Sequence, residues 1–370
     1  MKNLKTFLLL LLVIPFFISC EKDEPEISKE CILLDGKFFD GILFYEVINS
    51  TDARVKFVDE NYREEKIVIP HKIKFDENVF LVTEIDSYAF SGCSGLTSIE
   101  IPNSVTSIGD GAFSGCSGLT SIEIPNSVTS IGECWVFSDC SGLTSIVVEA
   151  GNPVYDSREN CNAIIETETN KLIAGCQNSF IPNSVTSIGF GAFDGCSGLT
   201  SLEIPNSVNS MGESALSYCS GLTSVVWNAV IGHLHYKWYH PFEGSTENLT
   251  SFVFGDSVQY IPSYLCANMS KLTSIEIPNS VNSIGDGAFY DCSGLTSVTI
   301  GNSVISIGKS VFDCCYRIIE INCKPITPPN IDSNSFCDFN ATMNVPKGAL
   351  SNYKNHPIWG KFKNINEVYF

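Results

Sequence analysis

Apolar and polar residues follow one another along this chain in a unit of 23 or 24 residues that recurs many times. One copy spans residues 94–116 and reads SGLTSIEIPNSVTSIGDGAFSGC. Its first half has the apolar spacing L-x-x-I-x-I, which predicts a short strand with one buried face. Proline then ends the strand because it has no amide to donate. The segment VTSI predicts a second short extended piece, and we expect a single helical turn at GAFSGC.

The copies follow one another closely enough to stack. SGLTS begins at residues 94, 117, 141, 197, 220 and 293, with the variants ENLTS at 247 and SKLTS at 270. One copy alone buries too few side chains to fold, whereas stacked copies cover each other's apolar layer. The pattern therefore predicts a repeat solenoid, right-handed, with parallel β-strands about 4.8 Å apart. We expect one continuous core through the whole array.

The full pattern, L-T-S-I-x-I-P-x-S-V-T-S-I-G-x-x-A-F-x-x-C, resembles the BspA-like leucine-rich repeats of Bacteroidota surface proteins. The resemblance extends over residues 66–326. It implies a leucine-rich-repeat array and a role like that of adhesins, which bind host matrix proteins or other bacteria. Ordinary leucine-rich repeats carry asparagine where this chain has Ser104, so we expect the usual asparagine ladder to be altered.

The first residues predict export. Two lysines precede an apolar run that ends at Ile18, which is typical of a signal peptide over residues 1–19. The following Ser19-Cys20 resembles the cleavage site of bacterial lipoproteins, and the resemblance implies that Cys20 carries a lipid. Residues 20–30 would then be a lipid-anchored tether on an outer membrane lipoprotein exposed at the cell surface. A plain secretory signal is the alternative.

Both ends of the array differ from its repeats, and both predict caps. Residues 31–86 alternate in short runs, which predicts a β-rich N-terminal cap followed by a degenerate first coil. Residues 87–326 carry the repeats. The prolines of INCKPITPPN break the pattern, and residues 327–370 predict a C-terminal cap with one short helix and a final strand.

Two insertions interrupt the repeats. Residues 149–180 contain AIIE and KLIA around TETN, which predicts a hairpin, and we favour a structural role for it. Cys161 and Cys176 are symmetric about its turn, so they form a possible disulfide.

The second insertion, residues 226–247, concentrates aromatic and histidine residues that suit recognition of a partner. Zinc binding by its histidines is a weaker hypothesis because no fourth ligand lies nearby. A structural cover over the edge of a coil, including Trp227 and Phe242, is the main alternative. The candidate binding residues are His233, His235, Tyr236, Trp238, Tyr239 and His240.

The net charge excludes some classes of partner, and the spacing of the cysteines indicates where they pack. The formal net charge of −19 argues against nucleic acid as a partner, and it limits contact with a membrane to the lipid anchor. Seven cysteines recur at one place in the repeat, and we expect these ladder cysteines to be buried free thiols. They are Cys93, Cys116, Cys140, Cys196, Cys219, Cys292 and Cys315.

No motif indicates catalysis. The chain has no phosphate-binding glycine loop, no HExxH and no G-x-S-x-G, so we expect no catalytic residue, no metal and no cofactor. The repeated Glu100, Glu123, Glu203 and Glu276 are best interpreted as a solvated row. The leading hypothesis is a cell-surface recognition protein that binds a host or bacterial surface protein. The alternative is a glycan-capture lipoprotein that uses Trp238 and Tyr239 as stacking platforms, and a hydrolase is the weakest hypothesis.

Overall fold

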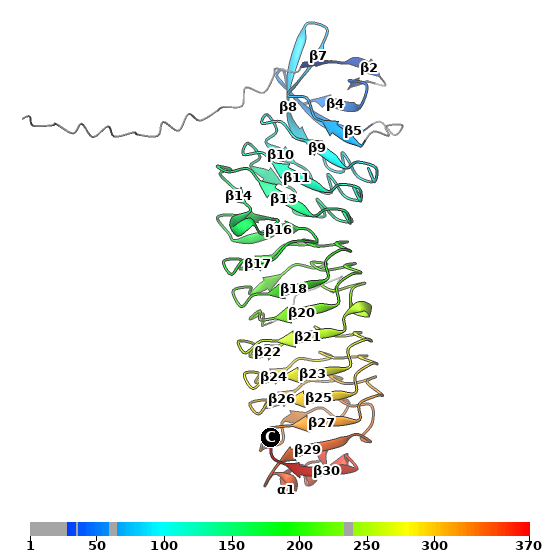
Figure 1. Ribbon diagram of the computed structural model, residues 1–370, viewed down its shortest axis with the longest axis vertical. Coiled ribbons are helices and arrows are strands. Elements are labelled where there is room, and N and C mark those ends of the chain that lie inside the picture. Colours follow the sequence, from blue (N-terminus) through cyan, green and yellow to red (C-terminus); the bar gives the residue numbers. More distant parts are fainter. Residues whose placement is uncertain (1–27, 35, 59–64, 233–239) are drawn as a thin grey trace, which may run out of the picture.

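The protein is a long stack of coils with a small sheet at its N-terminal end and a short helix at the other (Figure 1). This computed structural model describes residues 28–34, 36–58, 65–232 and 240–370. The signal peptide, Cys20 and five of the six candidate binding residues, His233, His235, Tyr236, Trp238 and Tyr239, lie outside the described residues. Among the helices of the described ranges, none combines the length and apolarity needed to cross a membrane.

The L-x-x-I-x-I segments form the first strand of each coil. Neighbouring coils pair these strands in parallel with serine opposite serine, as at Ser274 and Ser297, so identical side chains stack in register. The predicted leucine-rich-repeat array is confirmed. Its first strands are β6 (Lys66–Val68), β9 (Ser98–Glu100), β11 (Ser121–Ile124), β13 (Ser145–Val148), β18 (Ser201–Ile204), β20 (Ser224–Trp227), β21 (Ser251–Phe254), β23 (Ser274–Ile277), β25 (Ser297–Ile300), β27 (Glu320–Cys323), β29 (Thr342–Pro346) and β30 (Asn364–Val368).

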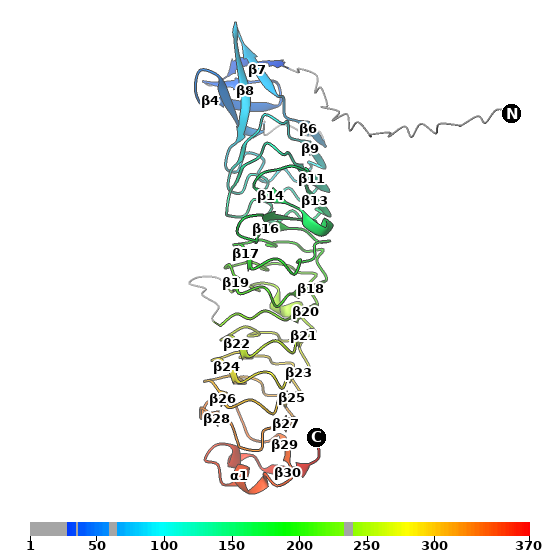
Figure 2. The ribbon, with the colours of Figure 1, turned by 90° about the vertical axis from the view of Figure 1, so that its left-hand side faces the viewer.

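The VTSI segments form a second row of two-residue strands along another side of the stack (Figure 2). They too pair in parallel from coil to coil, as Ile284 does with Ile307. These strands are β10 (Ser107–Ile108), β12 (Ser130–Ile131), β17 (Ser187–Ile188), β19 (Ser210–Met211), β22 (Tyr260–Ile261), β24 (Ser283–Ile284), β26 (Ser306–Ile307) and β28 (Asn330–Ile331).

The N-terminal sheet continues directly into the array. Its last strand pairs in parallel with β10, which places Ile85 opposite Ile108. The segment KIVIP supplies β6, which pairs with β9 as one repeat does with the next. The strands of this sheet are β1 (Ser28–Glu30), β2 (Ile32–Leu34), β3 (Lys37–Phe39), β4 (Leu43–Val47), β5 (Asp52–Val58), β7 (Lys72–Phe75) and β8 (Asn78–Ile85).

The corner that carries A-F-x-x-C is not the expected helical turn. It consists of consecutive turns in which two residues per coil have a left-handed conformation, for example Trp135 (φ 53°) and Asp139 (φ 56°). The first of these places carries an aromatic residue, glycine or serine, for example Tyr88, Gly111 and Ser214. A Cβ atom added at Gly111 would lie only 2.3 Å from Cε1 of the Tyr88 ring, so the ring leaves no room for a side chain there. Close stacking of coils therefore requires glycine beneath each ring.

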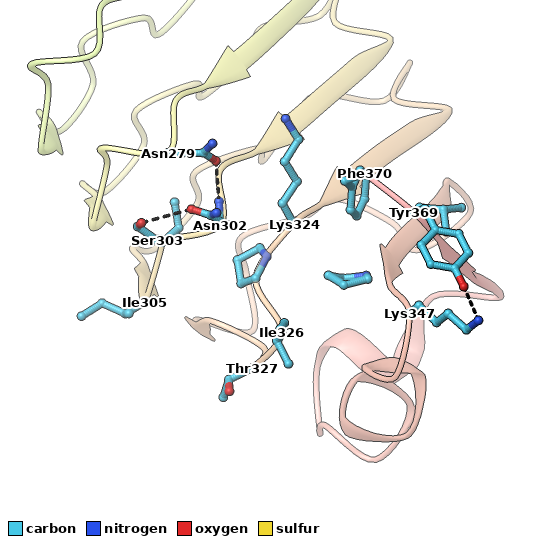
Figure 3. A pocket seen from close by; sticks show the side chains of 14 residues that line it. Asn279, Asn302, Ser303, Ile305, Lys324, Ile326, Thr327, Lys347, Tyr369 and Phe370 are labelled. Atoms are coloured by element: carbon cyan, nitrogen blue, oxygen red, sulfur yellow. Dashed lines mark hydrogen bonds between the residues drawn. The ribbon is translucent and has the colours of Figure 1, made fainter.

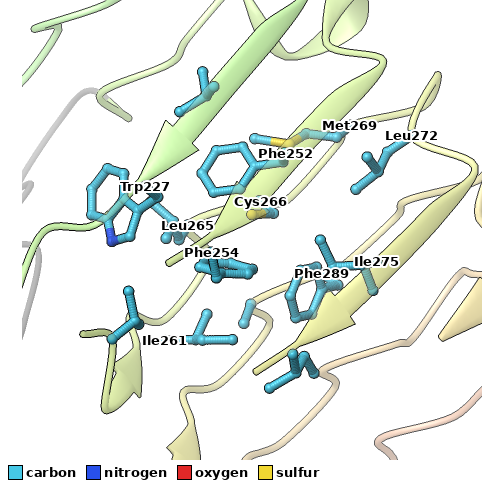
Figure 4. Packing of buried hydrophobic residues seen from close by; sticks show 14 of the residues in the cluster. Trp227, Phe252, Phe254, Ile261, Leu265, Cys266, Met269, Leu272, Ile275 and Phe289 are labelled. Carbon is cyan, nitrogen blue, oxygen red and sulfur yellow. The ribbon is translucent and has the colours of Figure 1, made fainter. Parts of the chain in front are cut away.

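Phenylalanine rings stack through the core at one place in the repeat. Phe90, Phe113 and Phe137 stack at 5.4 Å between ring centres. Leu216 and Cys266 occupy this place in two coils. Between them Trp227 and Phe252, from strands β20 and β21, fill the space that the smaller side chains leave (Figure 4). Large strand residues thus compensate for small corner residues.

The core is divided into two clusters, so the expectation of one continuous core is wrong. The N-terminal cluster runs from Cys31 to Cys176 and the C-terminal cluster from Cys161 to Phe362. They meet at the first insertion, where β15 (Ala163–Glu166) pairs antiparallel with β14 (Tyr155–Asp156) and with β16 (Lys171–Gly175). The short helix η1 (Arg158–Asn160) lies between β14 and β15. In β15 successive side chains enter alternate clusters, because successive residues of a strand point to opposite faces. Ala163 and Ile165 lie in the C-terminal cluster, and Ile164 lies in the N-terminal cluster.

The same alternation explains why the predicted disulfide between Cys161 and Cys176 is not formed. A bulge between Ile164 and Ile165 shifts the register by one residue, so that Ala163 lies opposite Gly175. A shift of one residue moves a side chain to the other face. Cys161 consequently packs in the C-terminal cluster and Cys176 in the N-terminal cluster, and both are free thiols.

The C-terminal end contains the predicted short helix and final strand. Helix α1 (Leu350–Lys354) and the turn η3 (Trp359–Lys361) precede β30, which pairs in parallel with β29. Tyr353 and Trp359 are fully buried there and complete the C-terminal cluster. Another short turn, η2 (Thr246–Asn248), lies in the second insertion.

Candidate interaction surface

The repeated threonines hold neighbouring coils together. The Thr144 hydroxyl donates to the Thr120 carbonyl oxygen at 2.9 Å, and Thr296 donates to Thr273 in the same way. At the place of the usual asparagine, the Ser127 hydroxyl donates to a backbone carbonyl of the preceding coil at 2.6 Å. Ser104 and Ser257 make the same kind of bond, whereas the buried hydroxyls of Ser207 and Ser280 have no partner among the described residues, so serine replaces asparagine in only part of this ladder. Much of the polar repetition seen in the sequence is explained by stacking alone.

The repeated glutamates form a solvated row. Glu276 accepts a hydrogen bond from Lys324 Nζ at 3.3 Å, and Glu203 accepts one from the Asn228 amide at 2.8 Å. Both carboxylates lie on exposed strand positions. An acid and base pair for hydrolysis needs carboxylates in different environments. This row places its carboxylates in equivalent ones, which supports the interpretation as a soluble face.

The ladder cysteines are free thiols, and all except the half-buried Cys93 are buried. The Cys116 and Cys219 thiols each donate to a carbonyl oxygen of the preceding coil, at 3.1 and 3.0 Å. Burial raises the pKa of Cys140 and of Cys219 to about 12. A thiol needs a lowered pKa to act as a nucleophile or metal ligand at neutral pH. The ladder therefore contributes packing.

His240 is the one candidate of the second insertion that the described residues include, and the fold already uses its ring. Nε2 donates to the Tyr264 carbonyl oxygen at 2.9 Å, while Nδ1 accepts from the Phe242 amide at 3.1 Å. Burial lowers the pKa of His240 to about 4, so the ring is neutral at pH 7. With both nitrogens engaged, His240 positions backbone and does not suit a partner or a metal ion. No group of three or more potential metal ligands occurs within the described ranges.

The neighbouring aromatic residues of this insertion are part of the core. Trp227 and Phe242 are fully buried, with ring centres 6.4 Å apart. The structural alternative therefore holds for these two residues. Recognition by residues 233–239 stays a prediction.

A groove of about 1100 Å³ lies at the C-terminal end of the array (Figure 3). The turns that follow strands β23, β25 and β27 form one wall, and the residues after β29 and β30 form the other. The lining residues are Asn279, Asn302, Ser303, Val304, Ile305, Lys324, Pro325, Ile326, Thr327, Pro346, Lys347, Val368, Tyr369 and Phe370.

Large apolar side chains of the groove are strongly exposed. Ile305 and Ile326 are 66% and 67% exposed on one wall, and Tyr369 and Phe370 are 81% and 55% exposed on the other. Figure 3 shows the two pairs on opposite sides of the hollow. Contiguous exposed apolar side chains mark interaction sites more often than isolated ones do.

Buried residues of the C-terminal cap fix one wall of the groove. The Tyr353 hydroxyl donates to the Pro325 carbonyl oxygen at 2.8 Å, and Trp359 Nε1 donates to the Pro329 carbonyl oxygen at 2.9 Å. Both donors are buried, so the proline-rich loop is held at two points. Ile326 is thereby presented to solvent by a supported backbone.

The charged side chains that line the groove are both cationic. Lys324 and Lys347 are in the lining, which contains no aspartate or glutamate. Lys347 Nζ lies 4.7 Å from the centre of the Tyr369 ring and hydrogen-bonds to its hydroxyl. This contact at the hydroxyl end of the ring keeps Tyr369 at the groove.

Sequence analysis alone did not find this groove. Its residues come from five turns between residues 279 and 370, and each turn alone is unremarkable. The available signals were the prolines of INCKPITPPN, interpreted only as the end of the repeats, and the terminal aromatic pair Tyr369 and Phe370.

Comparisons with known proteins found similar solved structures. A search of curated proteins found no match. A leucine-rich cell surface protein from Faecalibacterium prausnitzii is similar at 21% identity, with 78% of this chain and 94% of that chain covered and a TM-score of 0.40. A leucine-rich repeat protein from Bacteroides ovatus is 20% identical over 90% of this chain and 99% of that one, with a TM-score of 0.40. The pneumococcal vaccine antigen PcpA is 15% identical over 93% and 99%, with a TM-score of 0.41.

The family comparison covers most of the array. The model of the BspA type leucine-rich repeat region matches residues 69–161, 163–240 and 239–353. These ranges include the first insertion and the beginning of the C-terminal cap. The chain belongs to the BspA-type leucine-rich repeat family.

Proposed function

We propose that this protein is a cell-surface recognition protein that binds a protein partner through the C-terminal groove. The groove carries the proposal because its exposed apolar side chains have no role in stacking coils. Substitution of such exposed side chains costs little stability, so the fold alone does not require them.

The composition of the groove suits a protein partner. Protein interfaces have an apolar centre surrounded by polar groups, and tyrosine is among the residues that dominate binding energy. The groove has this arrangement, with Ile326 and Tyr369 on facing walls and asparagine and lysine side chains around them. A protein partner is therefore favoured over glycan capture.

The proposal includes anchoring at the cell surface. Export by residues 1–19 and a lipid on Cys20 would hold the N-terminal sheet at the outer membrane. The groove lies at the opposite end of the stack (Figure 1). Such an arrangement would present the groove away from the membrane, where a partner on another surface can reach it.

A binding screen with a matched pair of variants tests the proposal. The purified protein is applied to arrays of host matrix proteins, bacterial surface proteins and polysaccharides. Ile326→Asp places a charge in the groove, whereas Ile319→Asp changes an equally exposed isoleucine (70%) outside it. We expect saturable binding to a protein that Ile326→Asp weakens at least about tenfold and Ile319→Asp leaves unchanged. Binding to polysaccharides alone, or equal loss in both variants, would overturn the proposal.

A further inference from the structure

The C-terminal end of the chain differs in charge from the array that it terminates. Residues 87–315 contain 20 acidic and 5 basic residues, a net charge of −15. Residues 316–370 contain 4 acidic and 6 basic residues, a net charge of +2. An acidic ligand is repelled along the array but not at the groove, since charges beyond about 8–10 Å are screened in physiological salt.

The fixed polar groups at the groove are arranged as hydrogen-bond donors. Asn279 Oδ1 accepts a hydrogen bond from the backbone N–H of Asn302 at 3.0 Å. Asn302 Oδ1 accepts one from the Ser303 hydroxyl at 3.2 Å. Each side-chain oxygen is thus engaged, and each Nδ2 remains to donate. Figure 3 shows these two asparagines together on one wall. Together with the two lysines, these Nδ2 groups give the groove several donors, which suit the carboxylate and carbonyl oxygens of a ligand.

The two lysines of the groove can both meet a ligand carboxylate. Lys347 makes no salt bridge to any described carboxylate, and its near neighbour is the Tyr369 hydroxyl. Lys324 pairs with Glu276 at 3.3 Å, but that glutamate is 72% exposed. Exposed ion pairs contribute about 0–1 kcal/mol, so a ligand carboxylate can replace Glu276 at little cost.

From these observations we infer that the groove binds an extended polypeptide segment in which apolar side chains alternate with or adjoin carboxylates. The inference rests on the proposed function and specifies the chemistry of the partner. Exposed Ile305, Ile326 and Phe370 take the apolar side chains, and the lysine and asparagine donors take the carboxylates and backbone carbonyls. The volume of about 1100 Å³ exceeds that of an ordinary small-molecule pocket, about 300–1,000 Å³, and therefore accommodates several residues.

Fluorescent peptides with matched sequences test the inference on the full chain. One set combines leucine and phenylalanine with aspartate and glutamate, a second replaces each acid by its amide, and a third replaces each acid by lysine. We expect the acidic set to bind about tenfold more tightly than the amide set, with the difference decreasing as salt is raised. Equal affinity of the acidic and amide sets, or tighter binding of the lysine set, would overturn the inference.

Charge reversal locates the interaction. Lys347→Glu should weaken binding of the acidic set at least about tenfold, because attraction becomes repulsion. Lys354→Glu makes the same change in net charge on α1, outside the groove, and should leave affinity within about twofold. Equal effects of the two substitutions would overturn the inference.

The outcomes separate this inference from the proposed function. Amide peptides that bind as tightly as acidic ones, with sensitivity to Ile326→Asp, would preserve protein recognition by the groove and overturn only the ligand class. If acidic peptides instead made two copies of the chain associate, seen as a doubled mass in sedimentation, the inferred ligand class would also be overturned. Binding confined to polysaccharides would overturn both.

Discussion

The division of the core into two clusters predicts that damage to one cluster stays within it. Phe113 is fully buried in the N-terminal cluster and stacks on Phe90 and Phe137, each at 5.4 Å. Phe312 is its counterpart in the C-terminal cluster, fully buried between Phe289 and Phe336 at 5.4 and 5.2 Å. The substitutions Phe113→Ala and Phe312→Ala thus remove the same group from equivalent surroundings.

The expected cost follows from burial and stacking. Replacing a buried phenylalanine by alanine costs about 3–5 kcal/mol. Loss of two stacked contacts, each about 0.5–1.5 kcal/mol, places both variants toward the upper part of that range. Since about 1.4 kcal/mol corresponds to a factor of ten, amide protection in the affected cluster should fall by about three orders of magnitude.

Hydrogen exchange measured by mass spectrometry distinguishes the two clusters. Phe113→Ala should lower protection within residues 31–148, and Phe312→Ala within residues 187–362, because the hairpin β15–β16 separates the two apolar regions. Repeat arrays transmit stability through neighbouring contacts, so a smaller change near the hairpin is expected in both. If either variant lowered protection equally in both clusters, the division would have no energetic meaning and this reasoning would fail.

Other substitutions test single features of the structure. Burial raises the pKa of Asp194 to about 6, so the ionised carboxylate opposes folding above that pH. In chemical denaturation, Asp194→Asn should increase the free energy of unfolding at pH 8 by up to about 3 kcal/mol. The same substitution should give no gain near pH 4. Burial lowers the pKa of His240 to about 4, so as the pH falls the imidazole is protonated in the unfolded state before it is protonated in the folded state. The free energy of unfolding should therefore fall by up to about 3 kcal/mol between pH 6.5 and pH 4. An unchanged pH dependence in His240→Gln would contradict this. The buried ladder cysteines should react with a thiol reagent only after unfolding, as mass spectrometry of labelled native protein would check. Cys20→Ser should release the protein from membranes into the soluble fraction, and continued membrane association would refute lipidation.

Stacking was predictable because the same side chains recur at the same places. Serine lies opposite serine and isoleucine opposite isoleucine in the paired strands, so the spacing of Leu96, Ile99 and Ile101 was enough to predict the array. A single helical turn was expected at the corner, but the structure has consecutive turns there. The left-handed conformation at Trp135 follows instead from the need to place each ring over the next coil, and this need is set by tertiary contacts.

Features that depend on one residue of register were not predictable. The bulge between Ile164 and Ile165 sends Cys161 and Cys176 to opposite clusters, and nothing in the local sequence marks it. The groove combines turns that lie between residues 279 and 347 with the last residues of the chain. The candidate binding residues predicted from sequence lie within residues 233–240 of one insertion. Trp227 and Phe242 of the same insertion are core residues, as the structural alternative expected.

Site-specific photo-cross-linking tests recognition by the groove most directly. A photoreactive amino acid replaces Ile326 in the groove or, as a control, the similarly exposed Ile319 outside it, in the full chain displayed on cells. The cells are irradiated with the protein partner identified in the binding screen, and cross-linked peptides are mapped by mass spectrometry. We predict a cross-link from position 326 and none from position 319. A cross-link from position 319, with none from position 326, would show that the partner binds elsewhere and would contradict the proposed function of the groove.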